Sequence, residues 1–187
     1  MRSWRALCLV LALGFTPRAI ADLTLRTSSF TGVAHASGSR LQAVRDATKP
    51  SIALVDLAGA THELKQHSGR VVLVHFFATW CEPCRDELAS LSRLTETARK
   101  DTLSVLAINV AEVPARLRRF LETTPVSFPV LLDADRRATK AWGVNILPTT
   151  FVLDRALVPR LFVEGDVDWM QADVRTVLER LGTADAN

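Results

Sequence analysis

The sequence is poor in cysteine: three occur in 187 residues, and only Cys81 and Cys84 stand close together. A structural zinc site usually takes four ligands, and no second cysteine pair is present to complete one. A c-type haem attachment would need a histidine directly after Cys84, where the sequence has Arg85. An inert structural disulfide is the remaining alternative, although closing a two-residue loop gains little chain entropy. The spacing therefore favours a redox-active pair.

The chain also lacks an apolar run long enough to span a bilayer, which takes roughly 20 residues. Its first apolar run, residues 6–15, follows Arg2 and Arg5 and precedes Ala19-Ile20-Ala21. This order is typical of a secretory signal peptide, here residues 1–21. The alternatives are an N-terminal helix of the folded domain and an uncleaved anchor. We expect an exported protein, periplasmic or otherwise secreted, that is soluble after signal cleavage.

A strong excess of one charge is absent as well. The formal net charge is +3, and the signal peptide carries three arginines and no acidic residue. Cleavage therefore balances the charges, and the balance gives no support for a nucleic-acid partner. Cys8 also leaves with the signal peptide. An exported chain whose only thiols form one C-x2-C motif is a redox module more readily than a disulfide-stapled scaffold.

The length suits one domain with a proper core, and no internal repeat or second domain is visible. Residues 22–50 are rich in Ser, Thr, Ala and Arg and have little periodicity, which predicts a leader or a strand added at a sheet edge. Residues 51–182 form the predicted domain, and residues 183–187 form a fraying tail.

Hydrophobic periodicity and turn residues predict the order of elements inside this domain. We expect a hairpin over 51–64, a buried strand over 103–110, a helix over 113–123, a short helix over 135–142, a second hairpin over 151–164 and a final helix over 171–181. Pro159 inside the last predicted strand argues that this strand lies at an edge. Strands followed by covering helices predict a three-layer α/β/α sandwich.

The cysteine pair lies where a buried strand passes into a helix. Every residue from Val71 to Ala78 except His75 is apolar, which is typical of a strand covered on both faces. After Pro83 the apolar spacing becomes helical, at Leu88, Leu91 and Leu94. The predicted helix runs from Cys81 to about Ala98.

A helix N-terminus favours a thiolate, because its free N–H groups and positive dipole end stabilise an anion. We therefore expect the pKa of Cys81 to lie below that of a free thiol. Pro83 suits the first turn, where its missing N–H costs nothing. Cys84, one turn in, should be more shielded. The interpretation is an exposed nucleophile, Cys81, and a resolving partner, Cys84, alternating between dithiol and disulfide.

The strand V-V-L-V-H-F-F-A-T followed by W-C-E-P-C resembles the active-site region of the thioredoxin superfamily, most closely the TlpA/ResA-like branch. Members of that branch are exported thiol-disulfide oxidoreductases, typically reductants in cytochrome c maturation or oxidase assembly. The resemblance implies a thioredoxin-like fold with an N-terminal hairpin and a central insertion. It also implies protein disulfide substrates and a membrane thiol reductase as electron donor. Such chemistry needs no organic cofactor or metal.

Pro148 opens the predicted strand that starts the second hairpin. Sequence alone predicts a trans peptide bond, because about 5–6% of X–Pro bonds in folded proteins are cis. The resemblance implies the opposite, since a cis-proline at the matching position of the superfamily faces the C-x2-C motif. It also implies that the backbone of Leu147 pairs with the substrate chain.

His75 is the main departure from the resembled family, in which thioredoxins have Asp and the TlpA/ResA-like branch usually has Asn. A histidine there could carry a proton to or from Cys84, or raise the thiolate content when charged. The alternative is a neutral buried histidine bonded to the backbone.

Three further residues are predicted to support the thiols. Glu87 matches a helix glutamate that lies near the thiols in the resembled family, where it could accept a proton or oppose the thiolate. The alternative is a solvated acid in the first turn. Glu82 is expected to be exposed and to tune potential or docking. Trp80 is expected to be partly exposed and to contribute to docking, the alternative being simple packing of a large ring.

Two other functions compete with a reductant. One is a copper-handling assembly factor, which would hold copper with a wider cysteine spacing and a distal histidine. No histidine follows His75, which argues against it. The other is a redox-inactive binding module of the same fold. The sequence leaves the client protein open.

Overall fold

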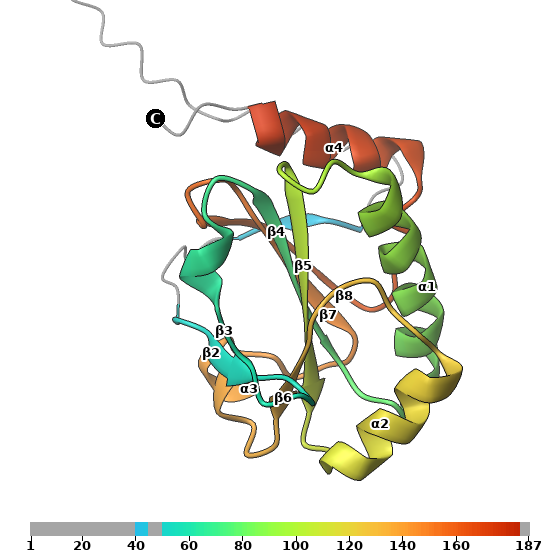
Figure 1. The fold of residues 1–187 in the computed structure, drawn as a ribbon. Coiled ribbons are helices and arrows are strands. Elements are labelled where there is room, and N and C mark those ends of the chain that lie inside the picture. Colours follow the sequence, from blue (N-terminus) through green and yellow to red (C-terminus); the bar gives the residue numbers. More distant parts are fainter. Residues whose placement is uncertain (1–39, 45–49, 184–187) are drawn as a thin grey trace, which may run out of the picture. The chain divides into compact units, whose positions relative to one another are not determined.

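The computed structural model describes residues 40–44 and 50–183, so the predicted signal peptide and most of the predicted leader lie outside the described residues. A six-stranded sheet runs in the order β1-β8-β7-β4-β5-β6 (Figure 1). Its strands are β1 Gln42–Ala43, β4 Val71–Phe77, β5 Leu103–Val110, β6 Val130–Asp133, β7 Thr149–Leu153 and β8 Pro159–Glu164. Strands β4, β5 and β6 are parallel, whereas β7 runs antiparallel to β4 and β8.

Strand β4 is the centre of this sheet, and all seven of its residues are buried. Successive side chains point to opposite faces of a strand. Leu73 and Phe77 therefore pack into one core, whereas Val74 and Phe76 pack into the other. Because both faces are covered, the apolar run has no alternating polar residues, and the predicted buried strand is confirmed.

Helices cover the two faces unequally. Three of them, α1 (Glu82–Thr97), α2 (Pro114–Thr123) and α4 (Ala172–Thr183), pack on the Leu73 face. The other face carries α3 (Arg137–Ala141), the 3₁₀ helix η1 (Leu64–His67) and the hairpin of β2 (Ala53–Val55) and β3 (Thr61–Glu63) (Figure 1). The result is the predicted three-layer sandwich with an N-terminal hairpin.

The predicted central insertion corresponds to α2 and β6, which lie between β5 and α3 in the chain. Strand β6 pairs with β5 and ends the sheet on that side. None of the described residues forms a helix long and apolar enough to cross a membrane.

The edge position predicted for the Pro159 strand is wrong. Strand β8 has β1 on its outer side, where Gln42 and Ala43 pair with Phe162 and Leu161. Pro159 is tolerated because β1 does not reach it: among the residues that the structure describes, the last bond on that side joins the Val44 N–H to the carbonyl oxygen of Arg160. Strand β1 itself lies inside the segment predicted as a leader or an edge strand.

Candidate active site

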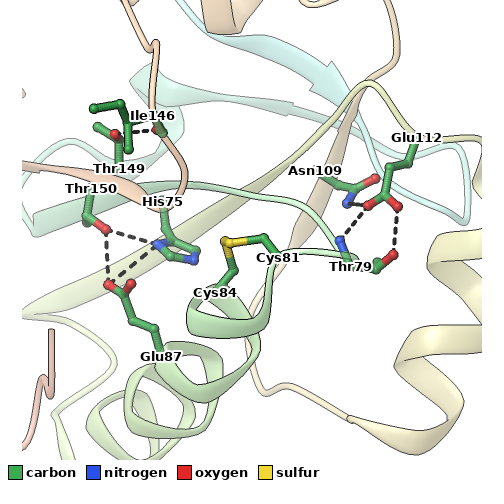
Figure 2. The surroundings of a disulfide bond; sticks show 10 residues. All are labelled: His75, Thr79, Cys81, Cys84, Glu87, Asn109, Glu112, Ile146, Thr149 and Thr150. Atoms are coloured by element: carbon green, nitrogen blue, oxygen red, sulfur yellow. Dashed lines mark hydrogen bonds and ion pairs between the residues drawn. A yellow bond between two sulfur atoms is a disulfide. The ribbon is translucent and has the colours of Figure 1, made fainter. Parts of the chain in front are cut away.

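Cys81 and Cys84 form a disulfide at the carboxyl end of β4, where the chain turns into α1 (Figure 2). Cys81 is the N-cap residue of the helix, and Cys84 lies in its first turn. Pro83 is also in this first turn, where its lack of an N–H leaves no helical bond unmade. Both sulfur atoms therefore sit at the positive end of a 16-residue helix.

Burial differs between the two cysteines, although less than expected. Cys84 is fully buried, so the prediction of a shielded resolving cysteine agrees with the structure. Cys81 is only 6% exposed, so the prediction of an exposed nucleophile is wrong for this oxidised state. The reason is that Cys81 packs into the same core as α1 and is bonded to Cys84. The two residues that follow Cys81, Glu82 and Pro83, are exposed.

The Leu147–Pro148 peptide bond is cis, as the resemblance implied and against the expectation from the sequence alone. The loop is closed by the Thr149 hydroxyl, which donates to the carbonyl oxygen of Ile146 at 2.8 Å. Leu147 packs against the core that contains both cysteines. It also lines a surface pocket of about 340 Å³ together with Trp80. The predicted substrate-pairing segment thus shares a pocket with the residue that precedes Cys81.

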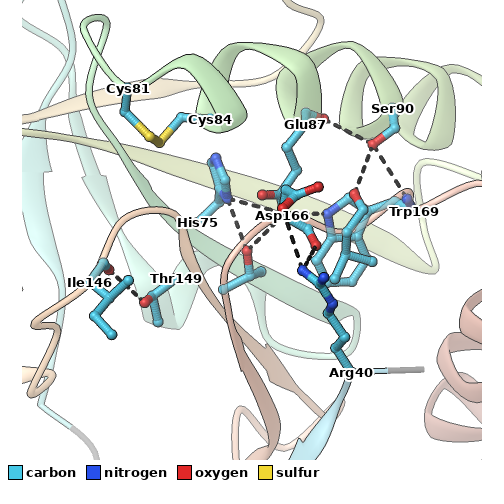
Figure 3. A network of polar contacts seen from close by, with 12 residues as sticks. Arg40, His75, Cys81, Cys84, Glu87, Ser90, Ile146, Thr149, Asp166 and Trp169 are labelled. Atoms are coloured by element: carbon cyan, nitrogen blue, oxygen red, sulfur yellow. Dashed lines mark hydrogen bonds and ion pairs between the residues drawn. A yellow bond between two sulfur atoms is a disulfide. The ribbon is translucent and has the colours of Figure 1, made fainter. Parts of the chain in front are cut away.

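A buried polar network lies behind the disulfide (Figures 2 and 3). His75 and Thr150 are direct partners across β4 and β7, and His75 Nδ1 lies 2.9 Å from the Thr150 hydroxyl oxygen. Glu87 Oε1 accepts hydrogen bonds from the Thr150 hydroxyl at 3.3 Å and from the Trp169 indole N–H at 2.6 Å. His75 Nδ1 and Glu87 Oε1 are 3.7 Å apart.

This network bears out one alternative considered from the sequence in part and overturns another. His75 is fully buried, as its alternative predicted, but its partner is the Thr150 hydroxyl rather than the backbone. Glu87 is not a solvated acid, because it is 2% exposed and lies on the inward stripe of α1 between Cys84 and Leu88. The helical spacing itself could have indicated that burial.

Burial moves the pKa values of His75 and Glu87 in opposite directions. Desolvation lowers the pKa of His75 to about 3. Desolvation raises the pKa of Glu87 to about 8, although the hydrogen bonds from Trp169 and Thr150 oppose this rise and the negative charge of Asp166 adds to it. In the oxidised protein at neutral pH, both groups are therefore uncharged.

A second buried carboxyl group, which the sequence analysis missed, holds the loop before Cys81. Glu112 follows β5 and accepts hydrogen bonds from the Thr79 N–H (2.7 Å), the Thr79 hydroxyl (2.6 Å) and the Asn109 amide (2.7 Å). The carboxyl ends of parallel strands meet at one edge of a sheet. An acidic residue just after the second buried strand is therefore the sequence feature that could have indicated this contact.

Apolar side chains are exposed around the disulfide. Trp80, which precedes Cys81, is 66% exposed, and Ile146 at the start of the cis-proline loop is 52% exposed. The tryptophan is thus more exposed than predicted, and simple packing does not explain its position. Exposed large apolar groups beside a reactive centre are typical of a docking surface.

Comparison with known proteins decides the family. The AhpC/TSA family model matches residues 45–158. The chain belongs to the AhpC/TSA family. Over 134 residues it is 31% identical to the thiol-disulfide oxidoreductase ResA of Geobacillus thermodenitrificans, covering 72% of this chain and 76% of the relative. Over 108 residues it is 34% identical to ResA of Geobacillus kaustophilus, covering 58% and 62%.

The solved structures agree on the fold of this AhpC/TSA family member. A secreted thiol-disulfide isomerase from Corynebacterium glutamicum superposes with a TM-score of 0.66 at 24% identity, covering 80% of this chain and 95% of that one. The chain is therefore a TlpA/ResA-like thiol-disulfide oxidoreductase of thioredoxin-like fold. Oxidoreductases of this class exchange two electrons between a cysteine pair and another disulfide or dithiol.

Proposed function

We propose that this oxidoreductase is an exported reductant of client-protein disulfides. Reduced Cys81 attacks one sulfur of the client disulfide, the client's S–S bond breaks, and a mixed disulfide forms. Cys84 then attacks the Cys81 sulfur and displaces the client's remaining cysteine. The client gains two electrons and two protons, and the Cys81–Cys84 pair becomes a disulfide.

The observation that carries this proposal is the asymmetry of the cysteine pair. Cys81 caps α1, follows the exposed Trp80 and keeps a small exposed surface of 6%, whereas Cys84 has none. A client cysteine reaches the first sulfur from the surface, and only an intramolecular thiol reaches the second position. This arrangement supports the order of attack and resolution.

The cis-proline loop supports a binding role for the client backbone. Leu147 packs against the core that contains both cysteines, and Pro148 is buried. In this proposal an extended client segment pairs with the backbone of Leu147, which holds its cysteine over Cys81. Main-chain pairing of this kind is tolerant of client sequence.

The place of the reaction in the cell belongs to the same proposal. The signal-like N-terminus and the description of the Corynebacterium neighbour as secreted support an exported or periplasmic location. An oxidising compartment would require a membrane thiol reductase to return electrons to the pair. Cytochrome c maturation and oxidase assembly are the pathway types that the family resemblance suggests.

A trapping experiment tests the proposed order of attack. Reduced Cys84→Ser protein is mixed with a small protein that has one surface disulfide, and adducts are mapped by mass spectrometry. We expect one covalent adduct through Cys81 that a dithiol releases, and none from Cys81→Ser. Wild-type protein should instead yield two client thiols for each Cys81–Cys84 disulfide formed. Failure of the wild type to generate client thiols would contradict the proposal.

A further inference from the structure

The pocket that Trp80 and Leu147 share lies at the carboxyl ends of the three parallel strands. Trp80 follows β4, Ala111 follows β5 and Arg136 follows β6, and all three line the pocket. The cis-proline loop contributes Leu147. Ligands of open α/β sheets commonly bind in the crevice outside this edge of the sheet. The pocket is therefore a place for part of a client, next to the residue that precedes Cys81.

Two residues of the pocket wall have an unusual backbone conformation. Ala111 has a φ of 57° and Arg136 a φ of 61°, a region that residues other than glycine rarely adopt. Both peptide N–H groups donate to the carbonyl oxygen of Asp133, at 3.1 Å each. The buried Asp133 carboxylate in turn accepts hydrogen bonds from the N–H and the hydroxyl of Thr139 in α3. Backbone held in this way is typical of a ligand-binding wall that is formed before the ligand arrives.

The pocket combines apolar side chains with one cation. Val110 and Val144 contribute apolar groups, and Arg136 is the only charged residue among the described residues that line it. No carboxyl group in the described part of the chain forms an ion pair with Arg136, whereas the next residue, Arg137, pairs with Asp135 at 2.6 Å. A guanidinium presents N–H groups in a fork that matches a carboxylate. The pocket is therefore complementary to an acidic side chain.

We propose that Arg136 is a specificity-determining residue that binds an acidic side chain of the client, one or two residues from the client cysteine. This inference rests on the proposed function, because it concerns the client segment that pairs with Leu147. When the client cysteine lies over Cys81, a neighbouring side chain of that segment enters the pocket beside Trp80. Its methylene groups contact the apolar wall, and its carboxylate accepts hydrogen bonds from the Arg136 guanidinium. The sulfur chemistry itself does not change.

The test uses synthetic peptides with one cysteine that is joined to 2-thiopyridine by a disulfide bond. Cys81 of the reduced protein attacks the peptide sulfur, because pyridine-2-thione is the better leaving group. This leaving group absorbs light and carries no charge that would compete for Arg136. The peptides have Glu, Gln or Lys at one of the two positions on either side of the cysteine.

At one of these positions, wild-type protein should react with the Glu peptide about fivefold faster than with the Gln peptide, as expected for a partly solvated ion pair. The Lys peptide should react more slowly than the Gln peptide. High salt should reduce both differences, because it screens the charges.

Three variants of Arg136 separate recognition of charge from effects on the backbone. Asn and Asp tolerate a positive φ. Arg136→Asn should therefore keep the fold and abolish the preference for Glu, and Arg136→Asp should reverse it in favour of Lys. Arg136→Lys keeps the charge without the fork and should retain part of the preference.

Arg137→Asn is the matched control. It removes the same charge from the next residue, which pairs with Asp135 and is not among the described residues that line the pocket. This variant should keep the wild-type preference. Every variant should reduce 2,2′-dithiodipyridine at the wild-type rate, because this small uncharged disulfide has no side chain to place in the pocket.

The outcomes distinguish this inference from the proposed function. Equal rates of wild-type protein with Glu and Gln at all four positions would overturn the role of Arg136. The same conclusion would follow if Arg136→Asn kept the wild-type preference, or if Arg137→Asn lost it to the same extent. Failure of reduced wild-type protein to release pyridine-2-thione from any peptide would instead contradict the proposed function.

Discussion

Glu87 and His75 share one buried site but affect stability in opposite pH ranges. The folded state binds the Glu87 proton up to a pKa of about 8, whereas an ordinary glutamate loses it near 4.5. Stability is therefore lost as the pH rises through this range. His75 stays neutral down to a pKa of about 3 against an ordinary value of 6.5, so its contribution is lost as the pH falls. Between about pH 4.5 and 6.5 the two effects oppose each other.

Above pH 6.5 only the Glu87 effect remains, which gives a prediction for the oxidised protein. The unfolded chain has an ionised Glu87 there and the folded chain a protonated one, so the free energy of unfolding should fall with rising pH, by at most about 1.4 kcal/mol per unit. Glu87→Gln should remove most of this slope. Denaturant unfolding at pH 6.5, 7.25 and 8 checks it. Equal slopes in both proteins would show that the Glu87 proton is not retained on folding.

At the level of single residues, the burial of a side chain was easier to predict from the sequence than its hydrogen-bond partner. The apolar run around His75 indicated its burial, because a strand covered on both faces encloses every side chain. Its partner Thr150 lies 75 residues away, and the Trp169 indole lies 82 residues from Glu87. Single-sequence periodicity is local, so it contains no information on such pairs.

At the level of elements, the strand-to-helix junction depends on a contact from the neighbouring strand. Long, strongly periodic segments such as β4, α1 and β5 could be predicted from the sequence. The two-residue strand β1 is too short for any period, so the position of β8 was predicted wrongly. Glu112 was missed for a related reason: its importance comes from the pairing of β4 with β5, which brings the ends of both strands together.

Glu112→Ala should therefore loosen the loop that leads into α1. It leaves the Thr79 N–H and the Asn109 amide without their shared charged acceptor, which should lower the free energy of unfolding by about 2–4 kcal/mol. Cys81 alkylation should slow as well. Glu122→Ala, at an exposed position on α2, is the control and should change stability by no more than about 0.5 kcal/mol. Equal stability of the two variants would mean that Glu112 does not hold the loop.

At the level of the whole molecule, the surface around the disulfide carries apolar side chains that the sulfur chemistry itself does not need. Trp80 and Ile146 are exposed on either side of the buried sulfur atoms, on the β4–α1 loop and the cis-proline loop. A small disulfide needs only the sulfur, whereas a protein client must also cover these apolar side chains. Large aromatic groups at the centre of an interface commonly dominate binding.

Trp80→Ala should raise the KM for a protein disulfide about tenfold, corresponding to a loss of about 1.4 kcal/mol of binding. Its rate with a small disulfide should change little. Val55→Ala is the control, because Val55 is an exposed apolar residue of β2, in the hairpin on the sheet face opposite α1. Steady-state reduction of both substrates checks the prediction. Equal losses with both substrates would indicate that Trp80 acts on the sulfur chemistry rather than on docking.

Residue-resolved alkylation of the reduced protein across a pH series tests most directly whether the helix N-terminus activates Cys81. Modification of each cysteine is followed by mass spectrometry, and the rate is plotted against pH. The account predicts that Cys81 reacts with an apparent pKa well below about 8.5, the value for a free thiol, and that Cys84 reacts more slowly throughout. A Cys81 midpoint at or above that value would contradict it.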